Sequence, residues 1–274
     1  MQYKGLSLCM PDEEKSCFAC CPPIRAAGYE HIQYKNIIKR ILRENTASFQ
    51  PKMMPITGYS CWALGYIDRN FKRIGCLLHP EQNRGTDLRH LTGYGEKCKR
   101  EFCLEARIFA NLEYETRLFW LQFAEGLDSF SYSSRLFNPI FRLLRWGKEV
   151  LEYIGKKEDY AKINLSLLEE RYPFLKSRTD PRGIAYPVKL ALKMGKAMLK
   201  EEIADLTNRM KRLYDFRIIE QQEGIYVHTL HMDRDLLDFI RLTLSIKKID
   251  PDIVLIIKDN IDHMVSEIKN AFQL

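Results

Sequence analysis

Cysteine is the residue whose number and spacing in this chain most clearly predict chemistry. All eight cysteines lie among the first 103 of 274 residues, and three of them belong to the run Cys17-Phe18-Ala19-Cys20-Cys21. Cysteines that serve only as small apolar core residues would be spread along the chain. Their concentration therefore indicates a local site that needs thiolates, which bind soft and borderline metals strongly.

The spacing of the cysteines favours metal ligation. Two residues separate Cys17 from Cys20, so a tight turn can present both sulfurs to one centre. Cys21 follows Cys20 directly, and we expect the two side chains to diverge, with Cys21 at a second centre or at another edge of a cluster. Buried thiols that bind no ligand are the structural alternative. The candidate metal ligands are Cys9, Cys17, Cys20, Cys21, Cys61, Cys76, Cys98 and Cys103.

Three residues downstream of Cys76 could complete or tune such a site. His79 lies at the end of a Cys-x2-His pair and could supply an imidazole ligand, although a lone histidine is more often a hydrogen-bonded structural residue. Asp87 and Arg89 could form hydrogen bonds or an ion pair that orients the ligands. A capped turn with a surface ion pair is the alternative for these two residues.

Size and composition favour a cytoplasmic protein. At 32.3 kDa the chain can bury a substantial core without disulfides. The sequence contains no signal-peptide-like stretch and no apolar run near the ~18 residues of a membrane span, so we expect no membrane association. In a reducing cytoplasm a cysteine-rich segment more often binds metal or does redox chemistry than forms disulfides.

The positive charge of the chain lies with its thiols. Residues 1–103 hold 16 Lys and Arg against 10 Asp and Glu, a net charge of +6, whereas the remainder holds 27 against 26, a net charge of +1. Four thiolates around Zn²⁺ or a [4Fe-4S]²⁺ cluster carry a net charge of about −2, which nearby cations would offset. Simple surface basicity is the alternative. Nucleic-acid binding is disfavoured, because phosphate binders usually carry a denser basic stripe.

The chain is predicted to be α-rich, with α+β character at most, and to have two parts. We expect residues 1–105 to form an irregular, metal-stabilised, cysteine-rich module with a turn at Cys21-Pro22-Pro23 and a short helix near residues 31–45. Residues 106–274 are expected to form a helical bundle with one short β-hairpin.

Apolar periodicity and helix-start signals predict the elements after Cys103. An apolar stripe indicates a helix over residues 104–123, and helices are expected to begin at Asn138-Pro139, Pro187, Asp233 and Asp250-Pro251. The helix from Pro187 is expected to be the largest and to reach residue 213. β-branched and aromatic runs at residues 216–219 and 225–230 predict the hairpin.

The cysteine motifs resemble those of a known family. Cys17-x2-Cys20-Cys21, then Cys61-Trp62-Ala63-Leu64, then Gly75-Cys76-Leu77-Leu78-His79-Pro80 with Arg89 and Cys98 downstream are similar to the boxes of the cysteine-rich zinc- or iron-chelating CxxCC family found widely in bacteria. The resemblance covers about the first 105 residues and implies a chelated metal centre but no particular reaction. The family's Arg-Pro-x-x-Cys-Arg segment is not reproduced, so the implied ligand role rests first on Cys17, Cys20, Cys21, Cys61 and Cys76.

The distribution of the thiols favours an iron–sulfur cluster over Zn²⁺. Structural zinc sites usually use two paired knuckles, whereas this chain has one close pair, Cys17/Cys20, and one looser pair, Cys98/Cys103. The other thiols are scattered, and a cluster accommodates them more easily because its ligands often come from distant segments. Eight thiols could complete two four-ligand centres, or one centre with thiols to spare.

Three classes of function remain open, and no catalytic residue can be assigned. The first is a cytoplasmic metal-binding protein whose helical part docks a protein partner or holds a substrate pocket. The second is a redox or group-transfer enzyme with the metal centre beside an interdomain pocket, for which Cys21 and Cys103 are candidate exposed, low-pKa thiols. The third is a nucleic-acid-associated module that uses the basic half of the chain. No Ser/His/Asp arrangement, P-loop or paired-carboxylate motif is recognisable.

Overall fold

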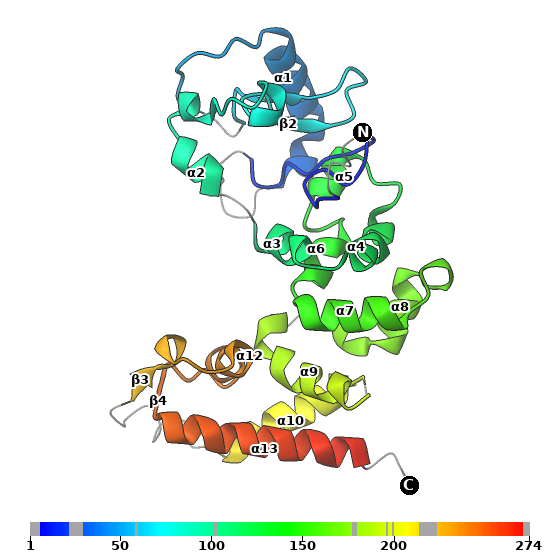
Figure 1. Cartoon of the computed structure of the whole chain (residues 1–274), viewed down its shortest axis with the longest axis vertical. Coiled ribbons are helices and arrows are strands. Elements are labelled where there is room, and N and C mark those ends of the chain that lie inside the picture. The colour runs from blue at the N-terminus through cyan, green and yellow to red at the C-terminus, as the bar shows by residue number, and fades with distance from the viewer. Residues whose placement is uncertain are drawn as a thin grey trace. The chain divides into compact units, whose positions relative to one another are not determined.

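The chain folds into two compact units, Met1–Leu144 and Arg145–Leu274. The computed structural model describes residues 6–21, 30–57, 60–100, 103–176, 180–195, 197–198, 200–213 and 224–270 (Figure 1). The described residues are mostly helical, which confirms the α-rich prediction. All eight cysteines belong to the first unit, together with the helices that follow Cys103 up to Leu144. The predicted functional boundary near residue 105 stays a prediction.

The first unit combines short helices, 3-10 turns and one small hairpin. Its 3-10 turn His31–Tyr34 leads into α1, and this pair confirms the helix predicted near residues 31–45. Other 3-10 turns cover Pro80–Gln82, Arg89–Thr92 and Gln122–Ala124. The helices and strands are α1 (Lys35–Ala47), β1 (Leu64–Tyr66), β2 (Ile74–Cys76), α2 (Gly95–Arg100), α3 (Leu104–Ala110), α4 (Tyr114–Leu121), α5 (Ser129–Ser133) and α6 (Pro139–Leu144).

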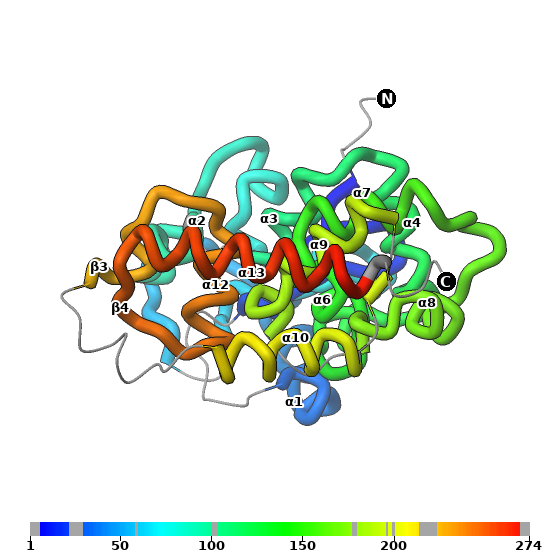
Figure 2. Tube along the Cα trace, turned by 90° about the horizontal axis from the view of Figure 1, so that it is seen from below, coloured from blue at the N-terminus to red at the C-terminus, as the bar shows by residue number. Residues whose placement is uncertain are grey.

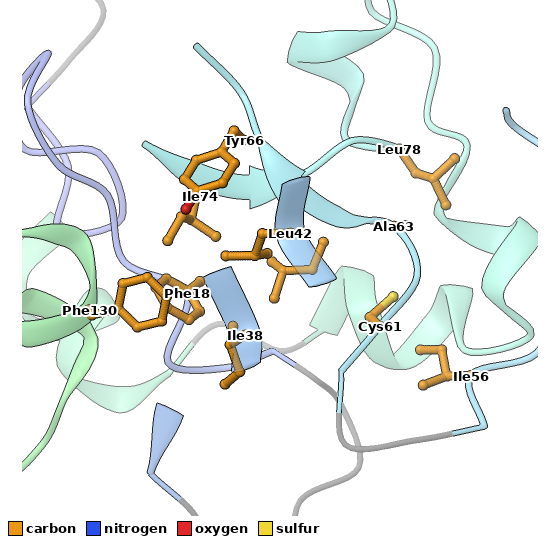
Figure 3. Packing of buried hydrophobic residues seen from close by; sticks show 11 residues of the cluster. Phe18, Ile38, Leu42, Ile56, Cys61, Ala63, Tyr66, Ile74, Leu78 and Phe130 are labelled. Atoms are coloured by element: carbon orange, nitrogen blue, oxygen red, sulfur yellow. The ribbon is translucent and has the colours of Figure 1, made fainter. Parts of the chain in front are cut away.

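The core of the first unit lies between α1, the hairpin and α5. Strands β1 and β2 pair antiparallel with Leu64 opposite Cys76, and α1 packs against β1. The Phe18 and Phe130 rings meet edge to face with their centroids 5.3 Å apart, while Cys61 lies among aliphatic side chains of the same cluster (Figure 3). Cysteines therefore contribute to this core directly.

The helix predicted over residues 104–123 is divided into α3 and α4. Glu113 adopts an extended backbone, and Leu112 turns into the core with 2% of its surface exposed. The Arg117 guanidinium bonds two carbonyls at the break, Leu112 O at 2.8 Å and Ala110 O at 3.1 Å. These bonds satisfy acceptors that a continuous helix would have paired internally, so the break is stabilised locally.

The second unit is built from longer helices and one two-stranded ribbon. Helices α9 and α10 both pack against α13 (Figure 2). A π-helical turn covers Phe239–Thr243, and 3-10 turns cover Tyr160–Lys162, Pro173–Lys176, Pro181–Gly183 and Val227–Thr229. The regular elements are α7 (Lys148–Lys157), α8 (Leu165–Arg171), α9 (Ala185–Lys193), α10 (Lys200–Leu213), β3 (Ile225–Tyr226), α12 (Arg234–Asp238), β4 (Lys248–Ile249) and α13 (Pro251–Asn270).

Three of the predicted helix starts are confirmed. Asn138 Oδ1 accepts from the Ile140 N–H at 3.0 Å at the start of α6, and Asp233 Oδ1 accepts from the Asp235 N–H at 2.8 Å at the start of α12. Asp250 Oδ1 accepts from the Asp252 N–H at 2.8 Å at the start of α13. A side chain that accepts from the first free N–H groups is what defines an N-terminal cap.

The prediction of one long helix from Pro187 is wrong. Helix α9 begins at Ala185, which puts Pro187 in its first turn, where proline is tolerated. The helix ends at Lys193, because Gly195 takes a left-handed conformation with φ of +82°. Gly147, also at φ +82°, similarly separates α7 from α6.

The predicted hairpin partner of residues 225–230 lies outside the described residues. Phe216–Ile219 is not described, and the pairing observed for β3 is antiparallel with β4, in the register Ile225 with Ile249 and Tyr226 with Lys248. The turn predicted at Pro22-Pro23 also lies outside the described residues. Among the described helices, none is both long and apolar enough to cross a membrane.

Candidate metal centre

All eight cysteines are free thiols rather than disulfides. Cys61 is buried, and the other seven are half-buried. They come from five separate segments of the first unit: the N-terminal loop, the Cys17–Cys21 run, the β1–β2 hairpin with the turn before it, helix α2 and the start of α3. Chain folding therefore brings thiols that are distant in sequence into one unit, in positions shielded from solvent.

Four thiols form what we call the first thiol group: Cys9, Cys17, Cys20 and Cys103. The Cys17 N–H donates to the Cys9 carbonyl at 2.8 Å, which holds these two residues side by side. Burial raises the pKa of the Cys9 thiol to about 12, and repulsion from Cys20 and Cys103 adds to the shift. Burial also raises the pKa of Cys17, with repulsion from the other three thiols.

The remaining four form the second thiol group: Cys21, Cys61, Cys76 and Cys98. Pairing of Leu64 with Cys76 and a 3.0 Å bond from the Leu64 N–H to the Cys61 carbonyl bring Cys61 and Cys76 together. Burial raises the pKa of Cys61 to about 12 and that of Cys76 to about 11, and repulsion from Cys98 adds to both shifts. Cys21 packs against the same core cluster as Cys76.

The two thiol groups meet at Cys20 and Cys21. A hydrogen bond between these two thiols is the largest cause of the raised pKa of Cys21, followed by burial and then by repulsion from Cys76 and Cys61. The expectation that the Cys20 and Cys21 side chains diverge is therefore wrong at the level of the sulfur atoms. Their sulfurs touch, while their other thiol neighbours differ.

Backbone N–H groups point at four of the sulfurs. The donor in each case lies two or three residues further along the chain, as in a tight turn that wraps around the sulfur. A hydrogen bond to sulfur favours the thiolate and so lowers the pKa, against the effect of burial. These turns are therefore suited to a charged sulfur. The pairs are Ala19 to Cys17, Ala63 and Leu64 to Cys61, Leu78 to Cys76, and Ala106 to Cys103, the last at 3.4 Å.

Asp87 and Arg89 form the predicted ion pair, and it faces the second thiol group. Arg89 binds the Asp87 carboxylate through two nitrogens, at 2.9 and 2.8 Å, and also donates to the Cys98 carbonyl at 3.2 Å. The hydrogen bond to Asp87 is the main reason that the pKa of Arg89 is raised, and charge on Cys76 and Cys98 adds to it. This guanidinium therefore interacts favourably with negative charge on these two sulfurs.

The first thiol group has an equivalent arginine, which the sequence did not identify. Arg135 binds Glu105 at 2.6 and 3.2 Å, and only 3% of the Glu105 surface is exposed. The hydrogen bond and the charge of Glu105 raise the pKa of Arg135 against the effect of its partial burial, and negative charge on Cys103 and Cys17 adds to the shift. Arg135 lies 32 residues after the last cysteine and outside any motif. Only the fold brings it beside the thiols.

His79 serves as a local cap. Its Nδ1 accepts from the Glu81 N–H at 3.3 Å at the start of the 3-10 turn Pro80–Gln82. Partial burial and the nearby Arg89 charge lower its pKa, which favours the neutral imidazole. This geometry supports the structural interpretation of His79 and leaves a ligand role without a supporting contact.

Cys21 and Cys103 do not have the acidity of reactive cysteines. Burial raises the pKa of Cys103, and the contact with Cys20 raises that of Cys21. Reactive cysteines normally have lowered pKa values, because the thiolate is the nucleophile. The prediction that either one is a low-pKa thiol is therefore wrong for this structure.

A pocket of about 470 Å³ opens within the first unit. Three lysines, Lys15, Lys39 and Lys72, and the rings of Tyr66, Phe71 and Phe130 contribute to its lining. The Lys15 ammonium lies 5.9 Å from the centre of the Tyr132 ring. Tyr132 is buried, and its pKa is raised first by burial and then by charge on Cys17 and Cys9. Lys15, which lines the pocket, lies two residues before Cys17 of the first thiol group.

The thiols are neighbours, but they do not form a complete coordination sphere. Among the described residues, no three His, Cys, Asp or Glu side chains are arranged to hold a metal ion as they stand. The donor set fits zinc or an iron–sulfur cluster in chemistry, because cysteine thiolates bind both.

Comparison with family models, curated proteins and solved structures found no match to this chain. The resemblance to the CxxCC family therefore stays a prediction that rests on the motifs alone.

Proposed function

We propose that this chain is a metal-binding protein in which thiolates of the first unit hold an iron–sulfur cluster or Zn²⁺, in a reducing compartment such as the cytoplasm. The observation that carries the proposal is the gathering of eight unbridged, shielded thiols from five segments into contiguous neighbourhoods. Inert core cysteines would have no reason to adjoin one another.

The electrostatics of the thiols support the same proposal. Burial and mutual repulsion together raise the pKa values of Cys9 and Cys61 to about 12, so these groups resist becoming charged side by side. A bound cation would lower these pKa values instead, because neighbouring thiolates that repel one another would each be attracted to the cation as ligands. The N–H groups directed at the sulfurs and the guanidinium groups of Arg89 and Arg135 would then stabilise the resulting negative charge.

The metal would supply different chemistry according to its identity. Zn²⁺ would brace the irregular loops of the first unit, since it has no redox chemistry. An iron–sulfur cluster could carry an electron as well. The wide separation of Cys9, Cys61 and Cys103 along the chain favours the cluster, whose ligands often come from distant segments.

Metal analysis of the full chain tests the proposal. The protein would be purified without oxygen, and its iron, zinc and acid-labile sulfide would be measured together with its visible spectrum. Iron and sulfide with broad visible absorbance support a cluster, and a colourless protein with stoichiometric zinc supports the zinc alternative. Folded protein that contains no metal and has eight titratable thiols would contradict both.

A second candidate function, a redox or group-transfer enzyme, is favoured by the pocket beside Tyr132 and Lys15. Its volume of about 470 Å³ falls in the range of small-molecule sites. An enzyme needs an accessible reactive group at the centre, so alkylation of only one or two thiols in the metal-loaded protein would favour this function. Uniform protection of all the thiols would argue for a structural or electron-carrying centre.

A further inference from the structure

We propose that the eight thiols form two separate four-thiolate centres, one made by the first thiol group and the other by the second, and that the Cys20–Cys21 peptide bond joins them. This inference rests on the proposed metal-binding function and deepens it. The sequence left open whether the thiols serve one centre or two.

Backbone geometry unites the members of the first thiol group. The 2.8 Å bond from the Cys17 N–H to the Cys9 carbonyl ties the N-terminal loop to the Cys-x2-Cys turn. Cys103 enters from the other side as the N-cap of α3, where its sulfur accepts from Ala106. The cysteine run, the N-terminal loop and α3 thus each contribute to one neighbourhood.

The second thiol group is assembled by the hairpin. The Leu77 N–H donates to the Ala63 carbonyl at 2.8 Å, so the turns that follow Cys61 and Cys76 lie against each other. Both turns direct an N–H group at their own cysteine sulfur. Arg89 fixes Cys98 beside them through its carbonyl.

The division between the groups follows from how their segments pack. The Phe18 N–H donates to the Ser133 hydroxyl at 2.9 Å, and Arg135, two residues further on, binds Glu105 at 2.6 Å, so the start of α3 with Cys103 lies near the Cys17 turn. Cys21 and Cys76 pack instead against the core cluster that contains Cys61. Four donors on each side match the ligand number of a tetrahedral zinc site and of a four-cysteine cluster.

Each group also has its own arginine, held by its own carboxylate. Arg135 with Glu105 faces Cys17 and Cys103, and Arg89 with Asp87 faces Cys76 and Cys98. Each ion pair is neutral overall, but it directs a guanidinium at one thiol group, where its N–H groups can stabilise the net charge of about −2 of a four-thiolate centre.

Adjacent cysteines can serve two different centres. In two-cluster ferredoxins, one cysteine of a continuous run ligates the other cluster. Consecutive Cα atoms are about 3.8 Å apart, so centres held by Cys20 and Cys21 would lie close together. Two iron–sulfur centres in this arrangement could exchange an electron directly. Two zinc ions would instead stabilise the turn that contains Cys20 and Cys21.

Metal stoichiometry in paired variants tests the division. Full-length wild type, Cys17→Ser, Cys61→Ser and the double variant would be loaded anaerobically with iron and sulfide or with zinc, and the metal per chain would be measured by native mass spectrometry. We expect two centres in the wild type, one in each single variant and none in the double variant. Ser60→Ala is the matched control, because the Ser60 hydroxyl is buried without a hydrogen-bond partner in the described part of the chain and is not a ligand.

Other outcomes separate the failure of this inference from the failure of the proposed function. Wild type with one centre, or a single substitution that removes all the metal, overturns the two-centre assignment and leaves metal binding intact. Wild type without metal overturns both.

A second measurement does not depend on how the variants fold. Stepwise chelation of wild type with alkylation and peptide mass mapping should label the thiols in two sets of four, divided as the two thiol groups are. Simultaneous labelling of all eight, or sets that mix the groups, contradicts the division.

Discussion

Among the residues that the structure describes, the same ion-paired turn occurs in both units. In the first unit Arg89 binds Asp87 through its guanidinium at 2.8 and 2.9 Å, and its backbone N–H donates to the same carboxylate at 3.0 Å. In the second unit Arg182 binds Asp180 in the same way, with a shortest contact of 2.7 Å and a backbone bond of 3.2 Å. The two Asp-x-Arg turns are locally equivalent.

Their surroundings differ, and that difference distinguishes the two units. Arg89 also donates to the Cys98 carbonyl, and negative charge on Cys76 contributes to its raised pKa. For Arg182, the corresponding contribution comes from the carboxylate of Asp238. The neighbours of the turn therefore decide what the ion pair can do. In the first unit the neighbours are cysteine thiols, and in the second unit they are ordinary side chains of a helical core.

The largest expected effect on the free energy of unfolding comes from truncating a buried phenylalanine in the core of either unit. Phe18 and Phe174 are both almost fully buried, at 1% and 0% exposure. Phe18→Ala and Phe174→Ala should each cost about 3–5 kcal/mol in the free energy of unfolding, measured by chemical denaturation. Because Phe18 lies between Cys17 and Cys20, only its variant should also lose bound metal. Equal metal content in the two variants would remove the proposed link between this core and the thiols.

A smaller effect is expected from the buried carboxylate beside the first thiol group. Arg135→Met removes the guanidinium from a Glu105 carboxylate whose side chain is 4% exposed, which should cost roughly 3 kcal/mol. Arg209→Met in the second unit breaks a solvent-exposed pair with Glu267 and should cost much less. Denaturant midpoints compare the two. The double variant R135M/E105Q should recover much of the loss, and an R135M variant as stable as R209M would contradict the argument.

The two Asp-x-Arg turns allow a matched test of how metal is held. Asp87→Asn frees Arg89 from the carboxylate that orients it, and metal affinity should fall by roughly 10- to 100-fold, as for other residues that position ligands. Asp180→Asn removes the equivalent carboxylate in the second unit and should leave affinity unchanged. Competition with a coloured chelator measures both. Equal affinities in the two variants would mean that Arg89 is not part of the site.

The smallest effect expected is a dependence of stability on pH. The hydrogen bond from Arg182 lowers the pKa of Asp180 below its usual value of about 3.9, so the folded state favours the carboxylate. This stabilisation is present above about pH 4 and is lost as pH falls through the lowered pKa. The difference in unfolding free energy between wild type and Asp180→Asn, less than about 1 kcal/mol at neutral pH, should therefore shrink as the pH falls below about 4. A difference that persists in acid would show that the ion pair is not its source.

Sequence patterns predicted the elements whose signals are local. Asn138, Asp233 and Asp250 begin helices because their side chains cap the first free N–H groups, and these caps depend on neighbouring residues alone. The pattern over residues 104–123 misled, because Leu112 is buried from the turn between α3 and α4, whereas Phe119 is buried from α4. Burial of the same face does not require a continuous helix.

The candidate site was predictable as a set of residue types but not as an arrangement. The cysteines and the Asp87–Arg89 pair were evident from the sequence, because thiolate chemistry and short spacing are visible there. Arg135 and Tyr132 were not, since the fold alone brings them beside Cys17. The division of the thiols also depends on the register of β1 and β2, which spacing does not fix.

Amide hydrogen exchange of the full chain, with metal bound and after chelation, tests most directly whether the first unit folds around metal. Structural zinc contributes about 10–16 kcal/mol of apparent binding free energy in small domains, which is folding free energy there. We predict that amides of β1, β2 and α1 lose protection when the metal is removed, while those of α9 and α13 keep theirs. Unchanged protection of the first unit after complete removal of metal would contradict the account.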